Sequence, residues 1–429
     1  MRHFIACHQF AKRVRSRLSW SSRRASLPRF LWQRQFQAFL LSTGLSSTSG
    51  AMAGVVYPWI VLQQTGSPAW VGIVIGVPAI IAIGPTFFGG ILADRIPKPK
   101  VLIATRFLQM NVAVLLALFV AQDEFAIWYL FALLVVGRVI TAIGFPAAST
   151  LIAEVVSNRD LKSANAARNV VGELTEIFGA GLGGIVLGLA GPATAFSVIA
   201  VVYGLSAIVM LWVSPRPAQI EEIGDQSTSD YGFSDAFLYL RGSRILQLLF
   251  VLVFVDLFTV ALFPLLPFYA DRVLGAGGAG FGILMAGLSV GGVVAGAALV
   301  KSGSPVSAPR AIVIGNVGWG ICMVGIDLSD RFAITLVLVV IMGGFAVVTG
   351  VAWSSLALRA MPVEMRGRLF SIFNIAFQAF FVGALLTGFV ASAFGLSAAM
   401  WIGAAGSIIV PTMVWTVSPT FRSADDGKW

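Results

Sequence analysis

Five charged side chains lie within long apolar stretches of the chain, where a charge is costly and generally marks function. They are Arg138, Glu154, Glu173, Glu176 and Asp256. A carboxylate in such surroundings can bind and release a proton, and protonation weakens its pairing with a guanidinium. We therefore expect these residues to exchange protons and ion-pair partners. Glu154 lies nearest the end of its apolar stretch, and we interpret it as interfacial.

Two of the glutamates belong to a polar stripe. Asn165, Asn169, Glu173 and Glu176 are spaced by four, four and three residues, so a helix places them on one face. A polar stripe exposed to lipid is expensive, and this one must therefore face protein or water. Two interpretations remain open: Arg138 pairs with Glu173 or Glu176 and joins adjacent helices, or one of these glutamates is a proton site.

The composition indicates where these residues reside. Of 429 residues, 58% are hydrophobic and only 11% are charged, and the mean hydropathy is +0.89. A soluble domain does not need so much apolar surface, whereas a bilayer accommodates it. The two cysteines, Cys7 and Cys322, indicate neither a disulfide framework nor a metal cluster. We expect no cofactor and no metal.

The elements that position the charges are membrane-spanning helices, each of which needs roughly 20 apolar residues. Twelve such runs occur, at about 36–62, 69–93, 100–121, 127–156, 165–190, 193–213, 244–270, 278–300, 308–327, 332–359, 368–394 and 397–417. One long hydrophilic link divides them six and six. The predicted segments are a basic tail (1–35), a first six-helix bundle (36–213), a linker (214–243), a second six-helix bundle (244–417) and a C-terminal tail (418–429).

Lysine and arginine predict the orientation. With the N-terminus inside, the inner loops and tails hold 25 of the 29 basic residues, and the outer loops hold Arg272 and Arg331. We therefore expect both termini in the cytoplasm, in a multi-pass protein of the plasma (bacterial inner) membrane. The net charge of +10 follows this pattern, and we expect no nucleic-acid partner. The basic tail itself admits three interpretations: a disordered tail, a segment lying on anionic lipid, or a cleaved transit peptide.

A short link between the second and third runs carries an unexpected acid. In "GGILADRIPKPKVLI" (89–103), basic residues such as Lys98 anchor the topology, but Asp94 contributes little to orientation. Gly90 lies four residues before Asp94 on the same helical face, where a small residue lets another helix approach. We expect Gly90, Asp94, Arg95 and Lys98 to form a conformational latch, in which the acid meets the positive end of a neighbouring helix or an arginine.

This link resembles the one between helices 2 and 3 of the major facilitator superfamily, through "G-x-L-A-D-R-x-x-K" at 90–98. The segments "PAASTLIAEVVSNRDLKSANAARN" (146–169) and "MPVEMRGRLFSIFN" (361–374) resemble its exporter branch, which includes the enterobactin exporter and macrolide efflux proteins. "GAGLGG" (179–184) is similar to a glycine-rich motif of antiporters. The resemblance implies two six-helix bundles that rock about a central cavity.

The resemblance also implies that the seventh run lines the cavity. Asp256 has no basic residue near it in its own run, so we interpret it as a proton or cation site and as a partner for Arg138 across the two bundles. A purely structural role for Asp256 is the alternative. Asn374 and Gln378 form an i, i+4 pair in the eleventh run, the counterpart of the polar stripe, and we add them to the expected cavity.

Several glycines and prolines are also predicted to take part in the conformational change. Gly179, Gly183 and Gly184 allow close helix packing, which here serves both structure and gating. Pro264 and Pro267 lie near the outer end of the seventh run, where they free backbone groups and bend the helix. We expect an outer gate there.

These features predict a monomeric secondary transporter, a proton-coupled antiporter that exports small amphipathic molecules such as drugs, siderophores or metabolites. The chain has no phosphate-binding loop for direct ATP drive. Uptake, or flipping of a lysophospholipid, is the alternative on the same fold. An intramembrane enzyme is a distant alternative, because "GLSVG" (287–291) lies inside an apolar run and no histidine outside the N-terminal tail can activate its serine. A receptor that transports nothing is equally distant.

Overall fold

The computed structural model describes residues 33–122, 126–157, 160–213, 233–302, 306–362, 365, 369, 372–373, 376–377 and 379–424. The basic tail up to residue 32, most of the predicted linker, and Asn374 and Gln378 lie outside these described residues, as does the side chain of Glu173.

The first bundle contains helices α2 to α7. Their bounds are α2 Arg34–Thr65, α3 Pro68–Ile81, α4 Ile83–Arg95, α5 Lys98–Val120, α6 Ile127–Val155 and α7 Leu161–Met210. Helices α3 and α4 form one crossing that is interrupted at Ala82, because Pro85 lacks the N–H that a continuous helix would use there. Helix α7 contains two crossings that meet at Gly191, whose φ of 78° breaks the helix before Pro192.

The second bundle follows the short helix α8, Phe233–Gly242. Its elements are α9 Arg244–Val253, α10 Asp256–Thr259, α11 Leu262–Phe268, the π-helical turn η3 Tyr269–Val273, α12 Gly277–Ser302, α13 Ala308–Asp327, α14 Phe332–Ala360, α16 Ala379–Phe394, α17 Leu396–Val417 and α18 Pro419–Arg422. The elements from α9 to η3 form a single interrupted crossing over 244–273.

The described helices account for twelve crossings. Ten are long and apolar enough to cross a membrane, and one of these, Ser163–Met210, holds the two crossings of α7. The shorter apolar helix over Phe380–Phe394 supplies the remaining crossing. The helix pattern predicted from hydropathy is therefore present in the structure.

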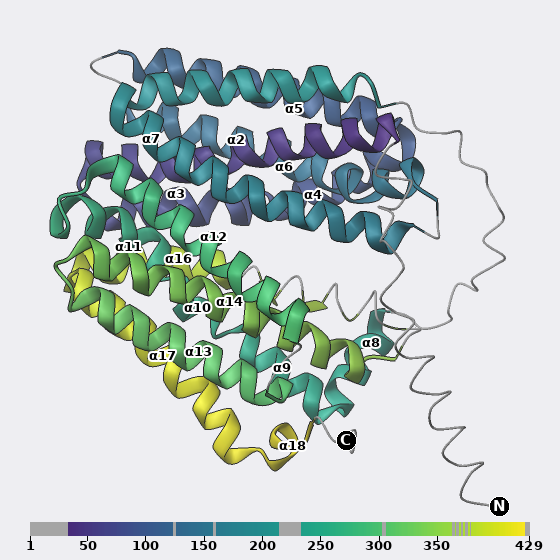
Figure 1. Ribbon diagram of the computed structural model, residues 1–429, viewed down its shortest axis with the longest axis vertical. Helices are drawn as coiled ribbons and strands as arrows, with labels where there is room; N and C mark the ends of the chain where they lie inside the picture. The colour runs from purple at the N-terminus through teal and green to yellow at the C-terminus, as the bar shows by residue number, and fades with distance from the viewer. Residues whose placement is uncertain are drawn as a thin grey trace, which may run out of the picture.

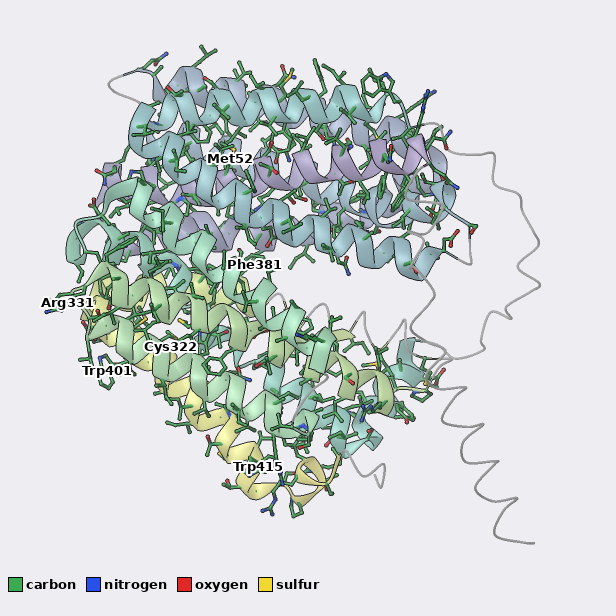
Figure 2. All side chains as sticks on the ribbon, in the orientation of Figure 1. Met52, Cys322, Arg331, Phe381, Trp401 and Trp415 are labelled. Atoms are coloured by element: carbon green, nitrogen blue, oxygen red, sulfur yellow. The ribbon has the colours of Figure 1, made fainter. Side chains whose placement is uncertain are left out.

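The two bundles lie side by side and meet toward one end. In Figure 1 the purple-to-teal first bundle and the green-to-yellow second bundle approach each other around α3, α11 and α16 and separate toward α4 and α8. We call the end that contains Gly66, Gly191 and Gly395 the far end, and the end that contains the α4–α5 link and α8 the linker end. Side chains fill both bundles, with Arg331 and Trp401 at the far end (Figure 2).

Small residues bring the helices within each bundle together. In the first bundle α2 packs extensively along α7, where a Cβ added at Gly183 would lie 2.9 Å from the Cα of Met52. In the second bundle Gly291 of α12 and Gly343 of α14 each lie directly against the backbone of the opposite helix. Because lipid gives helices no hydrophobic reason to associate, such close backbone packing is a main source of their attraction.

Candidate functional site

A cavity of about 900 Å³ lies between the two bundles. Its lining extends from Ser149 and Arg168, toward the linker end, to Pro58 and Phe281, toward the far end. The described polar lining residues come almost entirely from the first bundle; they are Thr43, Ser46, Ser47, Thr105, Arg106, Gln109, Arg138, Thr141, Ser149, Arg168, Asn169, Glu176, Tyr57 and Tyr203. The second bundle contributes Phe263, Phe281, Met285, Ser289, Phe380 and Phe381. One wall is therefore polar and the other mainly aromatic.

Arg138 projects from α6 into this cavity and is exposed there. Its guanidinium carbon lies 6.0 Å from the centroid of the Phe381 ring on α16, so the contact joins the two bundles. Phe381 lies at the boundary between the bundles in Figure 2. Among the described residues no ion pair joins Arg138 to a carboxylate, and the side chain of Glu173, the other predicted partner, lies outside these residues.

The polar stripe of α7 reaches the cavity. Asn169 and Glu176 both line it, whereas the amide of Asn165 donates to the Leu161 carbonyl at 3.0 Å, one turn earlier in its own helix. Glu173 belongs to the same helix, but its side chain lies outside the described residues. The structure therefore brings Glu176 to the cavity that Arg138 also faces.

Arg106 of α5 is a lining residue that the sequence analysis did not select. Its side chain is buried, and its Nη1 donates to the Ser42 hydroxyl at 2.6 Å. Ser42 in turn donates to the Ser206 carbonyl at 2.6 Å, and Ser206 donates back to the Ser42 carbonyl at 2.7 Å. These bonds hold three crossings of the first bundle around one cation. The signal in the sequence was an arginine inside an apolar run.

Two tyrosines, Tyr57 and Tyr203, share this cavity with Arg106 and Arg138. Both rings line the cavity. Nothing in their spacing along the chain predicted this meeting, because they come from the first and sixth crossings.

Asp256 is not among the residues that line this cavity. It begins the short helix α10, which packs against α16 and α17 inside the second bundle, and its backbone carbonyl accepts a hydrogen bond from the Thr259 hydroxyl at 3.4 Å. No ion pair joins it to Arg138 in the described residues. The reason is the interruption of this crossing, which directs α10 into the bundle and leaves Phe263 of α11 to form the cavity wall.

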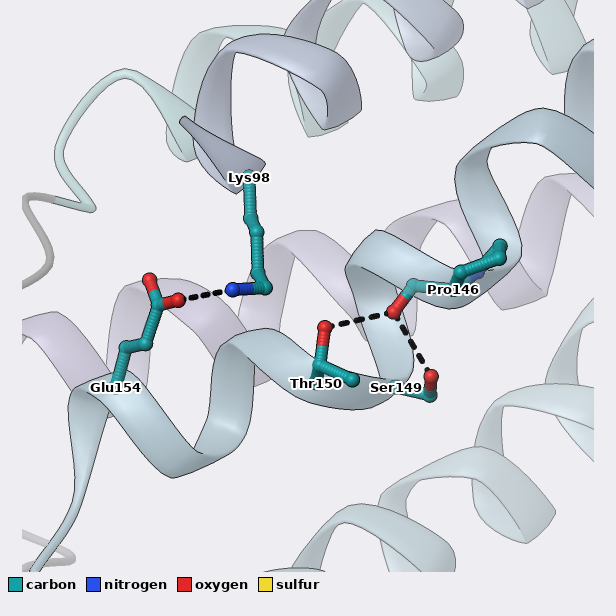
Figure 3. Close-up of polar contacts among 5 residues, drawn as sticks. All are labelled: Lys98, Pro146, Ser149, Thr150 and Glu154. Carbon is teal, nitrogen blue, oxygen red and sulfur yellow. Dashed lines mark hydrogen bonds and ion pairs between the residues drawn. The ribbon is translucent and has the colours of Figure 1, made fainter. Parts of the chain in front are cut away.

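The latch residues lie at the linker end. Asp94 and Arg95 are exposed, and a Cβ added at Gly90 would meet nothing within 4 Å, so the close approach expected at Gly90 is absent here. The neighbouring Gly89 makes that approach instead, against the backbone of Ile143 on α6. Lys98 forms an ion pair with Glu154 of α6, one turn beyond Thr150 (Figure 3).

The predicted glycines serve two different interfaces. Gly179 and Gly183 face α2 within the first bundle, where added Cβ atoms would lie 2.5 Å from the Thr48 carbonyl oxygen and 2.9 Å from the Met52 Cα. Gly184 faces the other bundle: its Cβ would collide with Gly282 of α12. Packing within the first bundle and packing between the bundles thus use different glycines of one helix.

Pro264 and Pro267 lie buried in α11, which contacts α2 and α3 across the interface. Because Pro264 has no N–H for the Val260 carbonyl, the N–H of Phe263 takes that carbonyl at 2.9 Å and tightens the helix. A π-helical turn follows over Tyr269–Val273.

Contacts at the far end close the cavity on that side. The Ala69 N–H donates to the Ser392 hydroxyl at 2.9 Å, and Arg272 Nη2 donates to the Gly66 carbonyl at 3.3 Å. Beside them, the Gly72 and Gly388 backbones touch, since a Cβ on Gly72 would lie 3.0 Å from the Gly388 Cα. All of these contacts join one bundle to the other, and they add to the packing of α3 against α16 and of α7 against α12.

Comparison with solved structures identifies the fold. The nucleoside transporter NupG matches with a TM-score of 0.72 at 13% identity, covering 90% of this chain and 98% of that one. A bacterial homolog of the human lysosomal transporter Spinster, in an inward-facing and unoccupied conformation, matches at 0.72 and 16%, covering 94% and 99%. A D-xylose-proton symporter matches at 0.66 and 15%, covering 93% and 99%.

The chain is therefore a transporter of the major facilitator superfamily, and the predicted fold of twelve helices in two bundles is confirmed. Within the superfamily, the model of the transmembrane secretion effector family matches residues 28–426, and the chain belongs to that family. Comparison with curated protein sequences found no match. The sequence predicted a multi-pass membrane protein that transports small molecules, and the family and structural matches agree with this prediction.

Proposed function

We propose that this transporter is a proton-coupled antiporter that exports small amphipathic molecules by alternating access. The observation that supports this best is the cavity itself. It lies between two bundles that touch at the far end, and it joins a polar wall with Arg138 and Glu176 to an aromatic wall. Such a hollow can hold a small amphipathic molecule at the boundary that moves when the bundles rock. The family description, secretion, supports the outward direction.

The linker end is the cytoplasmic end in this proposal, because it carries most of the basic residues. Both termini are then cytoplasmic, and the protein resides in the plasma membrane. On this assignment the conformation that is closed at the far end is inward-facing, the state also given for the Spinster homolog. In the outward-facing state the linker end closes, and the exposed Asp94 of the latch then meets the neighbouring bundle.

Glu176 is the proposed coupling carboxylate. It takes a proton while the cavity faces outward, so that the return of the empty cavity to the inward-facing state carries a proton. It loses the proton to the cytoplasm after the cavity turns inward, and the cycle begins again. Asp256 is the second candidate, since it is the intramembrane carboxylate of the other bundle and lies on the interrupted crossing.

The test uses vesicles in which the purified protein is reconstituted and a pH gradient drives transport of fluorescent amphipaths. We expect Glu176→Gln to abolish gradient-driven accumulation while substrate exchange without a gradient persists. Asp256→Asn is measured in parallel, and Asp330→Asn, an exposed carboxylate near the far end, is the matched control. Undiminished accumulation driven by the pH gradient in both the Glu176 and the Asp256 variants would refute proton coupling through these residues.

Uptake is the second candidate, because the nucleoside transporter and the D-xylose-proton symporter have the same fold. Reversing the pH gradient in the same vesicles separates the two directions. Export predicts accumulation on the acidic side, whereas proton-driven uptake predicts accumulation on the alkaline side. A chain that moves no solute in either direction would refute both.

A further inference from the structure

The polar wall of the cavity carries more positive than negative charge. Among the described lining residues, Arg106, Arg138 and Arg168 are cationic and Glu176 is the carboxylate. The three arginines come from three different crossings, α5, α6 and α7, so the excess among the described lining residues is spread over the wall. A ligand that enters this cavity therefore meets a positive surface on one side.

Arg106 is the most constrained of these cations. It is only 5% exposed, and its hydrogen-bond partner among the described residues is the neutral hydroxyl of Ser42. A hydroxyl can orient a guanidinium but cannot neutralise it, and an uncompensated buried charge is unfavourable. An anion bound in the cavity would supply the missing compensation.

Neutral donors line the same cavity as the two inner arginines. They include Tyr203 and Thr43. The Thr43 hydroxyl is buried and has no hydrogen-bond partner among the described residues. Hydroxyl groups can donate to an anionic oxygen, and a buried hydroxyl without a partner is unfavourable until something bonds to it. The wall thus offers donors as well as charge.

The opposite wall of the cavity is aromatic and can contact the apolar part of a ligand. Phe263 and Phe380 pack with ring centroids 5.5 Å apart, and Phe380 and Phe381 with centroids 5.4 Å apart. The contact of Arg138 with the Phe381 ring places the cationic wall directly beside this aromatic one. A molecule with one charged group and one aromatic or aliphatic body would touch both walls at once.

We propose that the cavity selects anionic amphipathic molecules. Arg106 and Arg138 hold the carboxylate, sulfonate or phosphate group, the Tyr203 hydroxyl donates a hydrogen bond to it, and the apolar body lies against the phenylalanines. This inference rests on the proposed function, because it names the substrate class of that transporter. A cation of the same shape would face two guanidinium groups and be rejected.

Binding is measured without transport, so that the two proposals fail separately. The full chain is placed in phosphatidylcholine nanodiscs and titrated with two probes that share a dansyl group, one ending in a carboxylate and the other in a primary amine. We expect the acid probe to bind at least tenfold more tightly than the amine probe, and its affinity to fall as the salt concentration rises. Equal affinities, or a preference for the amine, would overturn the assignment.

Substitutions locate the site. We expect Arg138→Gln to weaken the acid probe at least tenfold and to leave the amine probe unchanged or tighter, with Arg138→Lys recovering part of the loss. Arg106→Gln should act in the same direction; since Arg106 is buried, the exposed Arg138 keeps the test decisive if that variant does not fold. Arg310→Gln, an exposed arginine of α13 outside the lining, is the control. An unchanged acid affinity in Arg138→Gln refutes the site.

The anionic group could belong to a free solute or to a lipid headgroup. Nanodiscs that contain phosphatidylglycerol distinguish these sources: competition with the acid probe assigns the site to a headgroup, and unchanged affinity assigns it to a solute. If the acid probe binds but vesicles show no flux, the anion site stands and the transport proposal fails. If flux occurs but the amine probe is preferred, the transport proposal stands and the anion site fails.

Discussion

Gly184 provides the sharpest test of bundle movement. It lies on α7 against Gly282 of α12, where the two bundles meet toward the far end. A Cβ at Gly184 would collide with the Gly282 Cα, and it would also lie 2.9 Å from the Gly282 nitrogen and 3.2 Å from the Gly278 carbonyl oxygen. These neighbours are backbone atoms, which cannot rotate away. Gly184→Ala should therefore force α7 and α12 apart in this conformation.

The magnitude follows from the packing. Overfilling a tightly packed contact costs about 1–3 kcal/mol. If the far end is open in the alternative state, the added methyl group meets no neighbour there, and the penalty falls on one state only. A difference of about 1–3 kcal/mol shifts the ratio of the two states roughly 5- to 150-fold. The variant should populate the state that is open at the far end.

Double electron–electron resonance spectroscopy, which measures the distance between two spin labels, can detect this shift. Spin labels on cysteines introduced at Gln64 and Leu328, exposed positions of the two bundles near the far end, report the separation there. We expect a longer distance in Gly184→Ala. Gly350→Ala on α14 is the control, because its Cβ would meet nothing within 4 Å. A well-folded Gly184→Ala with an unchanged distance would show that the α7–α12 contact does not govern closure.

Three further substitutions test packing and polar contacts inside the first bundle. Gly183→Val should destabilise the protein by about 1–3 kcal/mol through overpacking against α2, and so lower its melting temperature, without changing the far-end distance between bundles; a changed distance would contradict the separation of the two interfaces. Ser42→Ala should cost about 1.5–3 kcal/mol, measured by thermal unfolding, because the buried Arg106 loses its hydroxyl partner, and an unaltered melting temperature would contradict this. Glu154→Gln should cost less than about 1 kcal/mol, with a smaller loss at high salt, because its pair with Lys98 is partly exposed; a loss independent of salt would refute an ionic contribution.

Hydropathy predicted the crossings because a bilayer imposes a length on every helix that spans it. The division of α7 was also predictable, since Gly191-Pro192 punctuates a run too long for one crossing. The interruptions of the seventh crossing were predictable only in part. Pro264 explains the tight turn at Val260, but neither proline nor glycine marks the earlier one at Phe254, where the Leu257 N–H bonds to the Phe254 carbonyl.

The neighbours of individual residues were harder to predict from the sequence than the helices themselves. The close approach expected at Gly90 occurs at Gly89, because one residue along a helix turns the side chain by about 100° toward a different neighbour. Arg138 was selected from its depth in an apolar run, and it does face the cavity. Arg106 was not selected, and its burial depends on the packing of α5 against α7 and on its hydrogen bond to Ser42 of α2.

The amino-acid sequence alone determined that this chain spans a membrane many times and carries ionisable groups at depth, because both properties follow from the local energetics of apolar and charged residues in lipid. Only the tertiary structure decided which of those groups share a cavity. Arg138 and Glu176 face it, while Asp256 lies among helices of its own bundle. Helix rotations set that partition, and they depend on how small residues from distant crossings pack together, which periodicity along one helix does not encode.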